Sequence, residues 1–459
     1  MTIDAYNFPI NCQSEFYRGE EKISGQQWAV ECLSLANEIN AFSEQNWLLY
    51  QDDFYQYSQY FFALLIAKKN IVLAQGQQCQ RFKQAEKLAD ISIGINSTFG
   101  DDEKNEQTLP SFTRSTNHEV NFKANASVFS NLAIDANTSI TLFTSGSTGE
   151  AKAVRKYWYQ FANEIECLAA LFLRSAKQHC VISTVTHKHI YGLLFKLIWP
   201  VFSNQQIVCE TIEYPEQLEN YCDKFSNIVL VSSPSYLSRT CRQLSQQASK
   251  SVNEIFCSGG ALSPEVAADF FNHNQQAIFE IYGSTETGGI AWRQQANNSQ
   301  WQLFPKHQVT IAEDSTMLLT STFLPKGEAY KTDDRVQLNG QFFTLLGRVD
   351  RIIKLHEKRL SLDELEAEIT RQAYVNASHC FLLDTPKSKG ALVAVIELTS
   401  QIALPLDVAD KKQLVSECKK ALLSVFEPAL LPRKWRFVAK LPFNSQGKLV
   451  KKSLVNLFI

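Results

Sequence analysis

Short apolar runs alternate with helical segments through the middle of the chain, and this alternation constrains the fold more than any other feature. Between Ile140 and about Leu346, runs rich in β-branched residues recur, and stretches with the apolar spacing of helices, such as 157–173, separate several of them. Strands that alternate with helices in this way are typical of a largely parallel sheet with helices on both faces. The sequence therefore predicts an α/β fold with mostly parallel sheets flanked by helices.

Composition divides the chain into a large first part and a small last part. Residues 96–137 are rich in Ser, Thr, Asn and Asp, which predicts a polar connector inside the first part. Near the other end, residues 363–372 have the pattern of an amphipathic helix with Ser361 as its N-cap. We expect a large domain over residues 1–347 and a small α+β domain over residues 348–459.

Charge and composition exclude several classes of partner. The 459 residues include 45 Lys and Arg against 47 Asp and Glu, so the formal net charge of −2 gives no electrostatic case for nucleic acid or an anionic membrane surface. The longest apolar stretches, such as 60–67, fall well short of the roughly 18 residues of a membrane helix, and no signal-peptide pattern opens the sequence. Eleven cysteines without a CxxC pair favour a reducing compartment over a disulfide framework or a zinc site. We therefore expect a cytoplasmic protein without a membrane span.

The segment 144–152, TSGSTGEAK, directly follows the expected strand 140–143. Two glycines among hydroxyl residues allow the backbone N–H groups to turn inward around phosphate oxygens, with the hydroxyls as further donors and Lys152 as a counter-charge. The phosphoryl-transfer pattern GxxxxGK[ST] does not occur in the chain. The alternative interpretation is a Ser/Gly turn between a strand and a helix.

Two more glycine-rich turns follow expected strands. The sequence YGSTETGG occupies 282–289 and SGGAL occupies 258–262. Both stand at the carboxyl ends of strands, where open α/β sheets place their ligands. Tyr282 offers an aromatic face for a purine, and Glu286 offers a hard carboxylate for Mg²⁺. Alternatively, Glu286 is an acid at the first turn of a helix.

Three later motifs complete an ordered series: YKTDDRV (330–336), LGRVDRIIKLHEKRLSLDELE (346–366) and LPFNSQGKLVKKSL (441–454). In this order and spacing the chain resembles the adenylate-forming superfamily of acyl- and aryl-CoA synthetases, nonribosomal adenylation domains and luciferases. The resemblance covers nearly the whole length and thins before about residue 135. It implies that ATP and Mg²⁺ activate a carboxylic acid as an acyl-adenylate with release of pyrophosphate. It further implies acyl transfer to the phosphopantetheine thiol of coenzyme A or of a carrier protein.

The same resemblance implies a set of nucleotide contacts. In it, the first motif closes over the β- and γ-phosphates, the second and third form an adenine slot, and an acid and an arginine reach the ribose. The residues that match these positions are Thr144, Ser145, Gly146, Ser147, Thr148, Gly149, Lys152, Gly259, Gly260, Ala261, Tyr282, Gly283, Ser284, Asp334 and Arg348. Thr285 and Glu286 match the contacts to the α-phosphate and Mg²⁺, and Thr148 is a second residue at the metal. Lys448 matches the C-terminal lysine that contacts both the carboxylate and the phosphoryl group.

Three positions that match the family have alternatives in the sequence itself. Asp333 precedes Asp334, so either acid can be the ribose contact, although the following Arg-Val favours Asp334. Lys448 stands close to Lys451 and Lys452, which by themselves suggest a solvated face. His189, two residues before Tyr191-Gly192, matches the family residue that lines the acyl pocket, whereas a lone histidine beside apolar residues is often structural. Asp350 matches the hinge about which the small, mobile C-terminal domain rotates between the half-reactions.

The chain departs from the family pattern at three positions. Ala151 replaces the usual proline before the phosphate-loop lysine, and Asp333 replaces a glycine. Glu357 stands where many members have a glycine in the wall of the thiol channel. A carboxylate there would crowd an incoming pantetheine arm, so adenylation is a firmer expectation than acyl transfer to coenzyme A.

The sequence constrains the type of reaction more than it constrains the acid or the acceptor. The expected pocket segments 191–195 and 288–292 contain no fixed charge for an amino group, which favours a medium-sized aryl or fatty acid as the small-molecule substrate. The acceptor is either coenzyme A or an acyl carrier protein. Two alternatives to a ligase stay open: a nucleotide-binding regulatory or scaffold protein without turnover, and a phosphotransferase that makes ADP.

Overall fold

The computed structural model describes residues 4–74, 80–93, 111–112, 132–145, 151–172, 178–240, 243–355, 358–383, 390–402, 404–443 and 449–459. The chain forms two compact units, the first made of residues 1–308 and 320–330 and the second of residues 309–319 and 331–459. The expected connector 96–137 falls mostly outside the described residues. The domain boundary at 347 and 348 stays a prediction.

The smaller sheet of the first unit has the strand order β6-β5-β3-β4-β7-β8. Its neighbours are parallel except for the antiparallel pair β7 and β8. The strands are β3 (Asn46–Leu49), β4 (Asn70–Leu73), β5 (Ile91–Ile93), β6 (Ser111–Phe112), β7 (Ser139–Ser145) and β8 (Ala151–Tyr157). This sheet therefore ends in a hairpin that contains the TSGSTGEAK segment.

The larger sheet of the first unit runs in the order β15-β14-β13-β12-β11-β9-β10-β1-β2. Its centre, from β13 to β1, is parallel, and the pairs at both ends are antiparallel. The strands are β1 (Glu15–Arg18), β2 (Glu21–Ser24), β9 (Cys180–Ser183), β10 (Gln206–Thr211), β11 (Ile228–Ser232), β12 (Val252–Cys257), β13 (Phe279–Ser284), β14 (Gly288–Gln294) and β15 (Asn298–Leu303). The parallel centre places the ends of β12 and β13, with their glycine-rich turns, at one edge.

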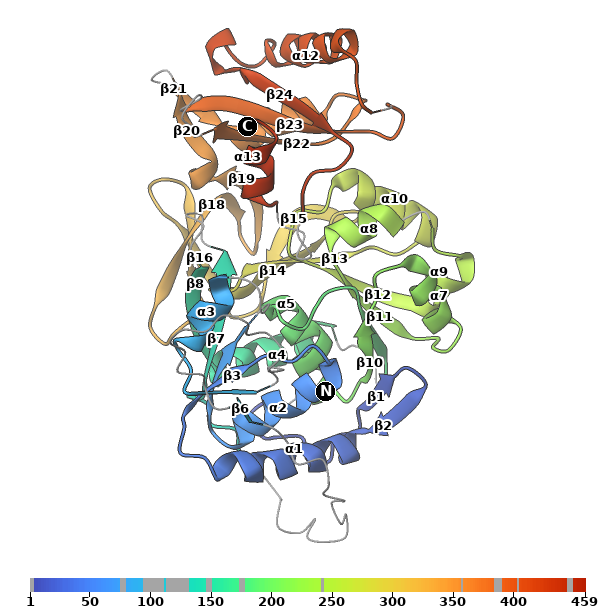
Figure 1. The fold of residues 1–459 in the computed structure, drawn as a ribbon, viewed down its shortest axis with the longest axis vertical. Helices are drawn as coiled ribbons and strands as arrows, with labels where there is room; N and C mark the ends of the chain where they lie inside the picture. The colour runs from blue at the N-terminus through green and yellow to red at the C-terminus, as the bar shows by residue number, and fades with distance from the viewer. Residues whose placement is uncertain are drawn as a thin grey trace, which may run out of the picture. The chain divides into compact units, whose positions relative to one another are not determined.

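Helices cover both faces of the larger sheet, as Figure 1 shows. On the face toward the smaller sheet, α1, α2, α4, η1 and α6 share one core with strands of both sheets. On the other face, α7, α8, α9 and α10 enclose a second core. These helices are α1 (Gly25–Asn40), α2 (Phe54–Ile66), α4 (Trp158–Phe172), α5 (Ile190–Gly192), the π-helix η1 (Leu193–Ile198), α6 (Trp199–Phe202), α7 (Pro215–Cys222), α8 (Pro234–Thr240), α9 (Gln246–Ser251) and α10 (Pro264–Asn274), with α3 (Gln80–Glu86) beside the smaller sheet. The predicted α/β class is confirmed.

Local signals explain how these helices begin. Asp53 is the N-cap of α2, and its side chain accepts a hydrogen bond from the backbone N–H of Gln56 at 2.9 Å. Such a cap satisfies one of the donors that a helix start leaves unpaired. The helix then buries almost every residue, because it lies between the two sheets rather than at the surface.

The second unit has its own strands and core. One group of strands runs β16-β17-β18-β19, a hairpin joins β20 to β21, and a three-stranded sheet has the order β22-β23-β24. The strands are β16 (Gln308–Ile311), β17 (Thr316–Thr320), β18 (Ala329–Asn339), β19 (Phe342–Arg348), β20 (Ile352–Leu355), β21 (Lys358–Ser361), β22 (Val375–Leu383), β23 (Ala391–Leu398) and β24 (Lys434–Val438). Its helices are the short 3₁₀ segments η2 (Val349–Arg351) and η3 (Pro428–Leu430), with α11 (Leu362–Thr370), α12 (Val408–Leu422) and α13 (Lys451–Asn456). Ser361 caps α11 as predicted, accepting from the N–H of Glu364 at 3.2 Å.

Candidate nucleotide-binding site

The candidate phosphate loop is the tip of the β7–β8 hairpin. Thr144 on β7 lies directly opposite Lys152 on β8 in the antiparallel register. The alternative interpretation of this segment, a turn between a strand and a helix, is wrong, because the loop joins two antiparallel strands. The predicted contacts Gly146, Ser147, Thr148 and Gly149, and the side chain of Ser145, lie outside the described residues.

A hollow of about 220 Å³ lies beside this hairpin in the first unit and is lined by both Lys152 and Glu286. Its other lining residues are Ala153, Val154, Arg155, Gln160, Leu324, Pro325, Glu328, Ala329 and Tyr330. Lys152 and Glu286 are 134 positions apart in the sequence, so only the fold brings them to one place. A lysine beside a carboxylate suits a polyphosphate that carries a divalent cation.

Among the described residues, no group of three or more His, Cys, Asp or Glu is arranged to hold a metal ion. Mg²⁺ does not require such a group, because it keeps several waters and is usually bound by one or two carboxylates together with substrate phosphates. The donor set around Glu286 therefore fits Mg²⁺ that arrives with a nucleotide.

Glu286 lies in a tight turn between the antiparallel strands β13 and β14. Within the turn, the N–H of Ser284 donates to Oγ1 of Thr287 at 3.0 Å, and the N–H of Thr287 donates to Oγ of Ser284 at 3.2 Å. Thr287 is completely buried, whereas Thr285 and Glu286 are half-buried. Reciprocal hydrogen bonds of this kind fix a turn locally, so Thr285 and Glu286 have defined backbone positions.

Two glycines let this turn pack closely. A Cβ atom on Gly283 would stand 2.2 Å from the carbonyl oxygen of Gly288. A Cβ atom on Gly289 would stand 2.5 Å from the ring of Phe304. Gly283 therefore has a steric role in addition to the nucleotide contact that the resemblance implies.

The two candidate parts of the adenine slot lie on adjacent parallel strands. Gly259, Gly260 and Ala261 are exposed just beyond β12, and Oγ of Ser258 donates to the carbonyl oxygen of Ile281 on β13 at 2.8 Å. The half-buried ring of Tyr282 packs against that of Trp301, with centroids 5.3 Å apart. The structure thus brings the SGGAL and YGSTETGG segments together at the carboxyl edge of the sheet.

The two histidines before α5 have different surroundings. His187 is buried with its Nε2 atom 3.2 Å from the carbonyl oxygen of Gln51, and its ring is 4.4 Å from that of Tyr57. Burial, reinforced by the nearby Lys196 cation, lowers the pKa of His187 to about 3. His189 is half-buried at the N-cap position of α5. Of the pair, His187 is therefore the structural histidine, and the pocket role of His189 stays a prediction.

The acidic residues expected at the ribose surround one arginine in the second unit. Asp334 on β18 lies opposite Arg348 on β19, and the Nη1 atom of Arg348 is 3.5 Å from Oδ1 of Asp334. The Nη2 atom of Arg348 is also 3.3 Å from Oδ2 of Asp333, and Arg348 donates to both oxygens of Asp350 at 2.9 Å. Asp350, followed by Asp334 and Asp333, raises the pKa of Arg348. Both candidate ribose acids thus contact the same guanidinium.

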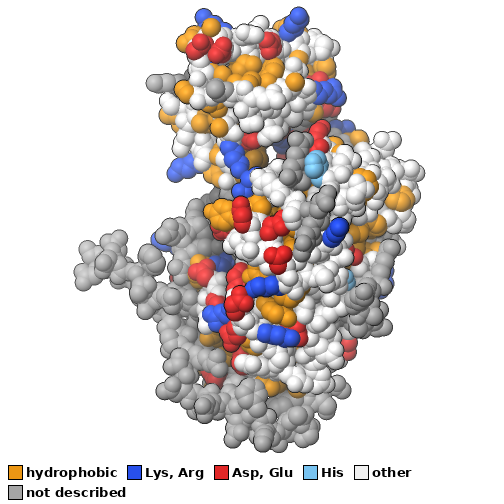
Figure 2. Space-filling view, turned by 90° about the vertical axis from the view of Figure 1, so that its right-hand side faces the viewer, with side chains coloured by type: hydrophobic (Ala, Val, Ile, Leu, Met, Phe, Trp, Pro, Cys, Tyr) orange, Lys and Arg blue, Asp and Glu red, His pale blue; other side chains and the backbone are white. Residues whose placement is uncertain are grey.

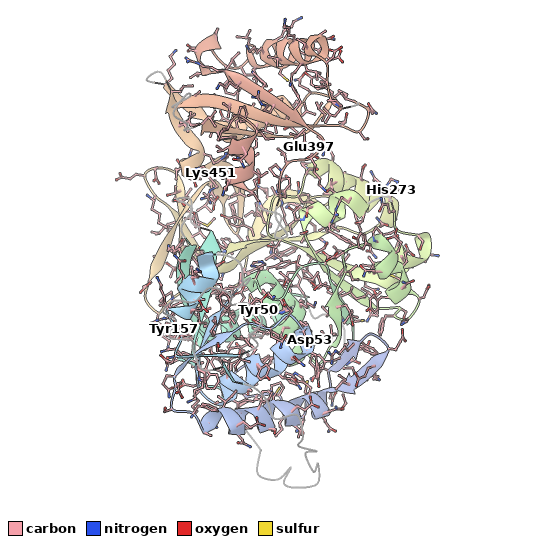
Figure 3. All side chains as sticks on the ribbon, in the orientation of Figure 1. Tyr50, Asp53, Tyr157, His273, Glu397 and Lys451 are labelled. Carbon is pink, nitrogen blue, oxygen red and sulfur yellow. The ribbon has the colours of Figure 1, made fainter. Side chains whose placement is uncertain are left out.

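The remaining candidates lie outside the described residues. These are Lys448 and, in the expected thiol channel, Glu357. Lys451, labelled in Figure 3, is exposed at the beginning of α13. Its position agrees with a solvated face for the lysines that follow Lys448.

Sequence reasoning missed two buried charged residues beside Glu286. Nζ of Lys156 on β8 donates to the carbonyl oxygen of Glu286 at 3.1 Å, and an oxygen of Glu164 on α4 accepts from the N–H of Gly289 at 2.7 Å. The burial of Glu164 could have been predicted from helical spacing, because Glu164 lies on the same buried face of α4 as Phe161 and Leu168. Segment 288–292 has no charged residue of its own, as the sequence shows, and α4 adds the buried Glu164 beside Gly289.

On the face shown in Figure 2, Lys and Arg side chains lie among Asp and Glu side chains rather than forming one basic surface over the described residues. No helix in the described part of the chain is long and apolar enough to cross a membrane.

Comparisons with known proteins agree with this geometry. A D-alanine--D-alanyl carrier protein ligase from Staphylococcus aureus (strain Newman) is 24% identical over 365 residues, which cover 72% of this chain and 73% of the relative. ATP-bound MatB from Rhodopseudomonas palustris matches with a TM-score of 0.79 at 14% identity, covering 100% of this chain and 99% of that one. O-succinylbenzoate coenzyme A synthetase (MenE) from Bacillus subtilis, in complex with AMP, matches with a TM-score of 0.77 at 14% identity, covering 96% and 95%. These structural likenesses show the fold.

The family model of AMP-binding enzymes matches residues 42–328, which is more than half of the chain. The matched range includes the β7–β8 hairpin, the SGGAL segment and the Glu286 turn. The chain therefore belongs to the AMP-binding enzyme family, the adenylate-forming superfamily that its motifs resemble.

Proposed function

We propose that this protein activates a carboxylic acid with ATP, forming an acyl-adenylate and pyrophosphate, and then transfers the acyl group to a phosphopantetheine thiol. The single observation that carries this proposal is the hollow that Lys152 and Glu286 line together. Adenylation must bring two anions into contact, a carboxylate and a triphosphate, and stabilise charge as it develops on the phosphate oxygens. A lysine and a carboxylate that line the same hollow suit that task.

The proposed roles follow the motifs. Lys152 neutralises the β- and γ-phosphates from the tip of the β7–β8 hairpin, and Thr285 orients the α-phosphate. Glu286 and Thr148 would hold Mg²⁺, which when bound withdraws charge from the phosphate oxygens. Asp334 binds the ribose hydroxyls, with Arg348 beside it. Lys448 contacts the carboxylate and the phosphoryl group during the first half-reaction.

The identity of the carboxylic acid is a separate part of the proposal. An aryl or fatty acid remains one candidate, since the apolar side chains of η1 lie in a core against which Trp292 of β14 packs. An amino acid is a second candidate, favoured by the similarity to a D-alanine ligase. The acceptor is proposed to be coenzyme A or a carrier protein, and the carrier-protein ligase among the relatives supports the latter.

Acid-dependent exchange of pyrophosphate into ATP tests the reaction. Purified protein is incubated with ATP, Mg²⁺ and labelled pyrophosphate, together with a panel of fatty acids, aryl acids and amino acids that includes D-alanine. We expect exchange with one class only, and mass spectrometry should detect the corresponding acyl-AMP. Exchange absent with every acid, while ATP still binds, would favour the regulatory or scaffold alternative, and formation of ADP instead of AMP would favour a phosphotransferase.

Substitution of Glu286 tests its proposed role as a ligand of Mg²⁺. Glu286→Gln should lower the exchange rate by at least about tenfold and raise the Mg²⁺ concentration needed for half-maximal exchange, because an amide is a weaker ligand for a hard cation. The matched control is Glu265→Gln at the exposed first turn of α10. Equal effects of the two substitutions would refute the role of Glu286.

A further inference from the structure

Buried ionisable side chains hold the backbone at Glu286 and at Gly289. Lys156 is 1% exposed, and its Nζ atom donates to the carbonyl oxygen of Glu286 at 3.1 Å and to that of Phe323 at 3.2 Å. Glu164 is 2% exposed, and its Oε1 atom accepts from the N–H of Gly289 at 2.7 Å. The two contacts thus bracket the turn from Glu286 to Gly289.

Both side chains come from one continuous segment of the chain. Strand β8 ends at Tyr157, labelled in Figure 3, and α4 begins at the next residue. Every second residue of a strand points to the same face, so Lys152, Val154 and Lys156 lie on one face of β8. Lys152 is exposed, whereas Val154 and Lys156 are buried. The strand that presents Lys152 to the hollow therefore also brings Lys156 into contact with the backbone of the Glu286 turn.

The environment of the pair favours a fixed arrangement. Burial lowers the pKa of Lys156 to about 8, and burial raises that of Glu164 to about 7. Charge-assisted hydrogen bonds to backbone groups are stronger than neutral ones, which favours the contacts of Lys156 with the carbonyl oxygens of Glu286 and Phe323. Gln160 also contributes, since its Nε2 atom donates at 2.6 Å to the same carbonyl oxygen of Phe323 that Lys156 contacts.

The second oxygen of Glu164 packs against the turn itself. A Cβ atom on Gly288 would stand 2.5 Å from Oε2 of Glu164, so the glycine and the carboxylate occupy complementary space. No hydrogen-bond partner of Oε2 is present among the described residues. The carboxylate is therefore held by the Gly289 N–H on one oxygen and by steric contact with Gly288 on the other.

We propose that Lys156 and Glu164 are positioning residues that clamp the Glu286 turn at Glu286 and at Gly289 and so fix Thr285 and Glu286 at the hollow. The inference rests on the proposed function, in which these two residues contact the α-phosphate and Mg²⁺. Lys156 and Glu164 act through the backbone of the turn and do not touch the nucleotide. Their loss should therefore impair the geometry of the metal site without removing a ligand.

Lysine variants and one matched control test the first half of the clamp. Lys156→Met removes the donor but keeps the side-chain length, and Lys156→Arg keeps a donor. Lys196→Met is the control, because Lys196 is also fully buried and donates to the backbone carbonyl oxygens of Cys209 and Glu210, away from the turn. Glutamate variants test the second half: Glu164→Leu removes the acceptor, whereas Glu164→Gln keeps one oxygen for the Gly289 N–H.

The first readout is hydrogen exchange of the backbone amides of residues 284–290, measured by mass spectrometry on the full chain. Lys156→Met and Glu164→Leu should exchange this segment at least about tenfold faster, while Lys196→Met leaves it at the wild-type rate. This readout needs no turnover. If no acid supports pyrophosphate exchange, the proposed function fails while the clamp is still tested; if the segment exchanges equally in all variants, the clamp is overturned.

The second readout is kinetic. Lys156→Met should lower kcat for pyrophosphate exchange and raise the half-saturating Mg²⁺ concentration severalfold, and Lys156→Arg should recover most of the loss. Lys196→Met should lower thermal stability without a change in Mg²⁺ dependence. Where Lys156→Met does not fold, the comparison of Glu164→Gln with Glu164→Leu decides, because a clamp predicts that only the leucine variant is impaired. Equal impairment of these two variants would contradict it.

Discussion

Arg348 forms a bidentate ion pair with Asp350, in which Nε and Nη2 each donate to a different carboxylate oxygen at 2.9 Å. The pair links the residue expected at the ribose to the residue expected at the hinge. Both side chains are 43% exposed, so the ion pair contributes at most about 1 kcal/mol to folding. Its geometry is therefore better suited to selecting a conformation than to stabilising the fold.

The first prediction concerns Asp350→Asn. If Asp350 is the hinge, loss of the bidentate pair should change the ratio of the two half-reaction rates by at least about threefold, while the free energy of unfolding changes by less than about 1 kcal/mol. Pyrophosphate exchange and thiol-dependent acyl transfer are measured separately, and unfolding is followed in urea. Asp314→Asn, which breaks an exposed ion pair with Lys331 in the same unit, is the control. An unchanged ratio for Asp350→Asn would remove it from the hinge.

The second prediction assigns a half-reaction to Lys448. Lys448→Ala should reduce pyrophosphate exchange by roughly a hundredfold, because the lysine is proposed to offset charge between the carboxylate and the phosphoryl group. Transfer from supplied acyl-adenylate to the thiol should stay mostly intact. Lys451→Ala, at the exposed start of α13, serves as the matched control and should leave both rates near wild type. Equal losses in the two half-reactions would contradict this division.

The third prediction concerns the space at Gly283. Gly283→Ala should destabilise the protein by about 1–3 kcal/mol, because the new Cβ atom meets backbone that cannot move without opening the turn. Pyrophosphate exchange should fall with it, since Glu286 lies in the same turn. Gly340→Ala is the comparison: its φ of 61° strains any side chain, but nothing lies within 4 Å of the added atom. An equal loss of exchange in both variants would show that the turn does not matter.

The fourth prediction is a pH dependence of stability that arises from His187. Its pKa in the folded protein is about 3, below the ordinary value, so the stability it contributes is complete at neutral pH and is lost as the pH falls below about 6.5. Between about pH 7 and about pH 5 this residue alone should lower the free energy of unfolding by about 2 kcal/mol.

Urea unfolding of variants at the two pH values checks the contribution of His187. His187→Gln keeps a donor for the carbonyl oxygen of Gln51 but cannot take up a proton, so its stability should fall less on acidification. His273→Gln, at an exposed position labelled in Figure 3, should behave like the wild type. A wild-type slope in His187→Gln would show that another group causes the acid sensitivity.

Much of the fold could be predicted from local patterns. The alternation of strands and helices led to the α/β class, and Ser361 caps a helix close to its expected start. These signals are local, because helical and strand periodicity and capping depend on residues only a few positions apart. The order of the motifs also led to the family that the AMP-binding model matches.

The structure departs from the sequence analysis where distant segments meet. TSGSTGEAK was open to interpretation as a turn before a helix, yet β8 pairs with β7 in an antiparallel register. Segment 288–292 contains no charged residue, yet α4 brings Glu164 to it. Neither the β7–β8 pairing nor the contact between Glu164 and Gly289 can be predicted from one segment alone. Each depends on which strand or helix becomes the neighbour.

The sequence by itself determined the motifs, the class of fold and the residue types available to bind a nucleotide. Only the tertiary structure decided that Lys152 and Glu286 line one hollow and that Lys156 and Glu164 hold the turn between β13 and β14. The physical reason is that periodicity specifies which face of a strand or helix is buried. Which two buried faces come together is set by sheet order and long-range packing.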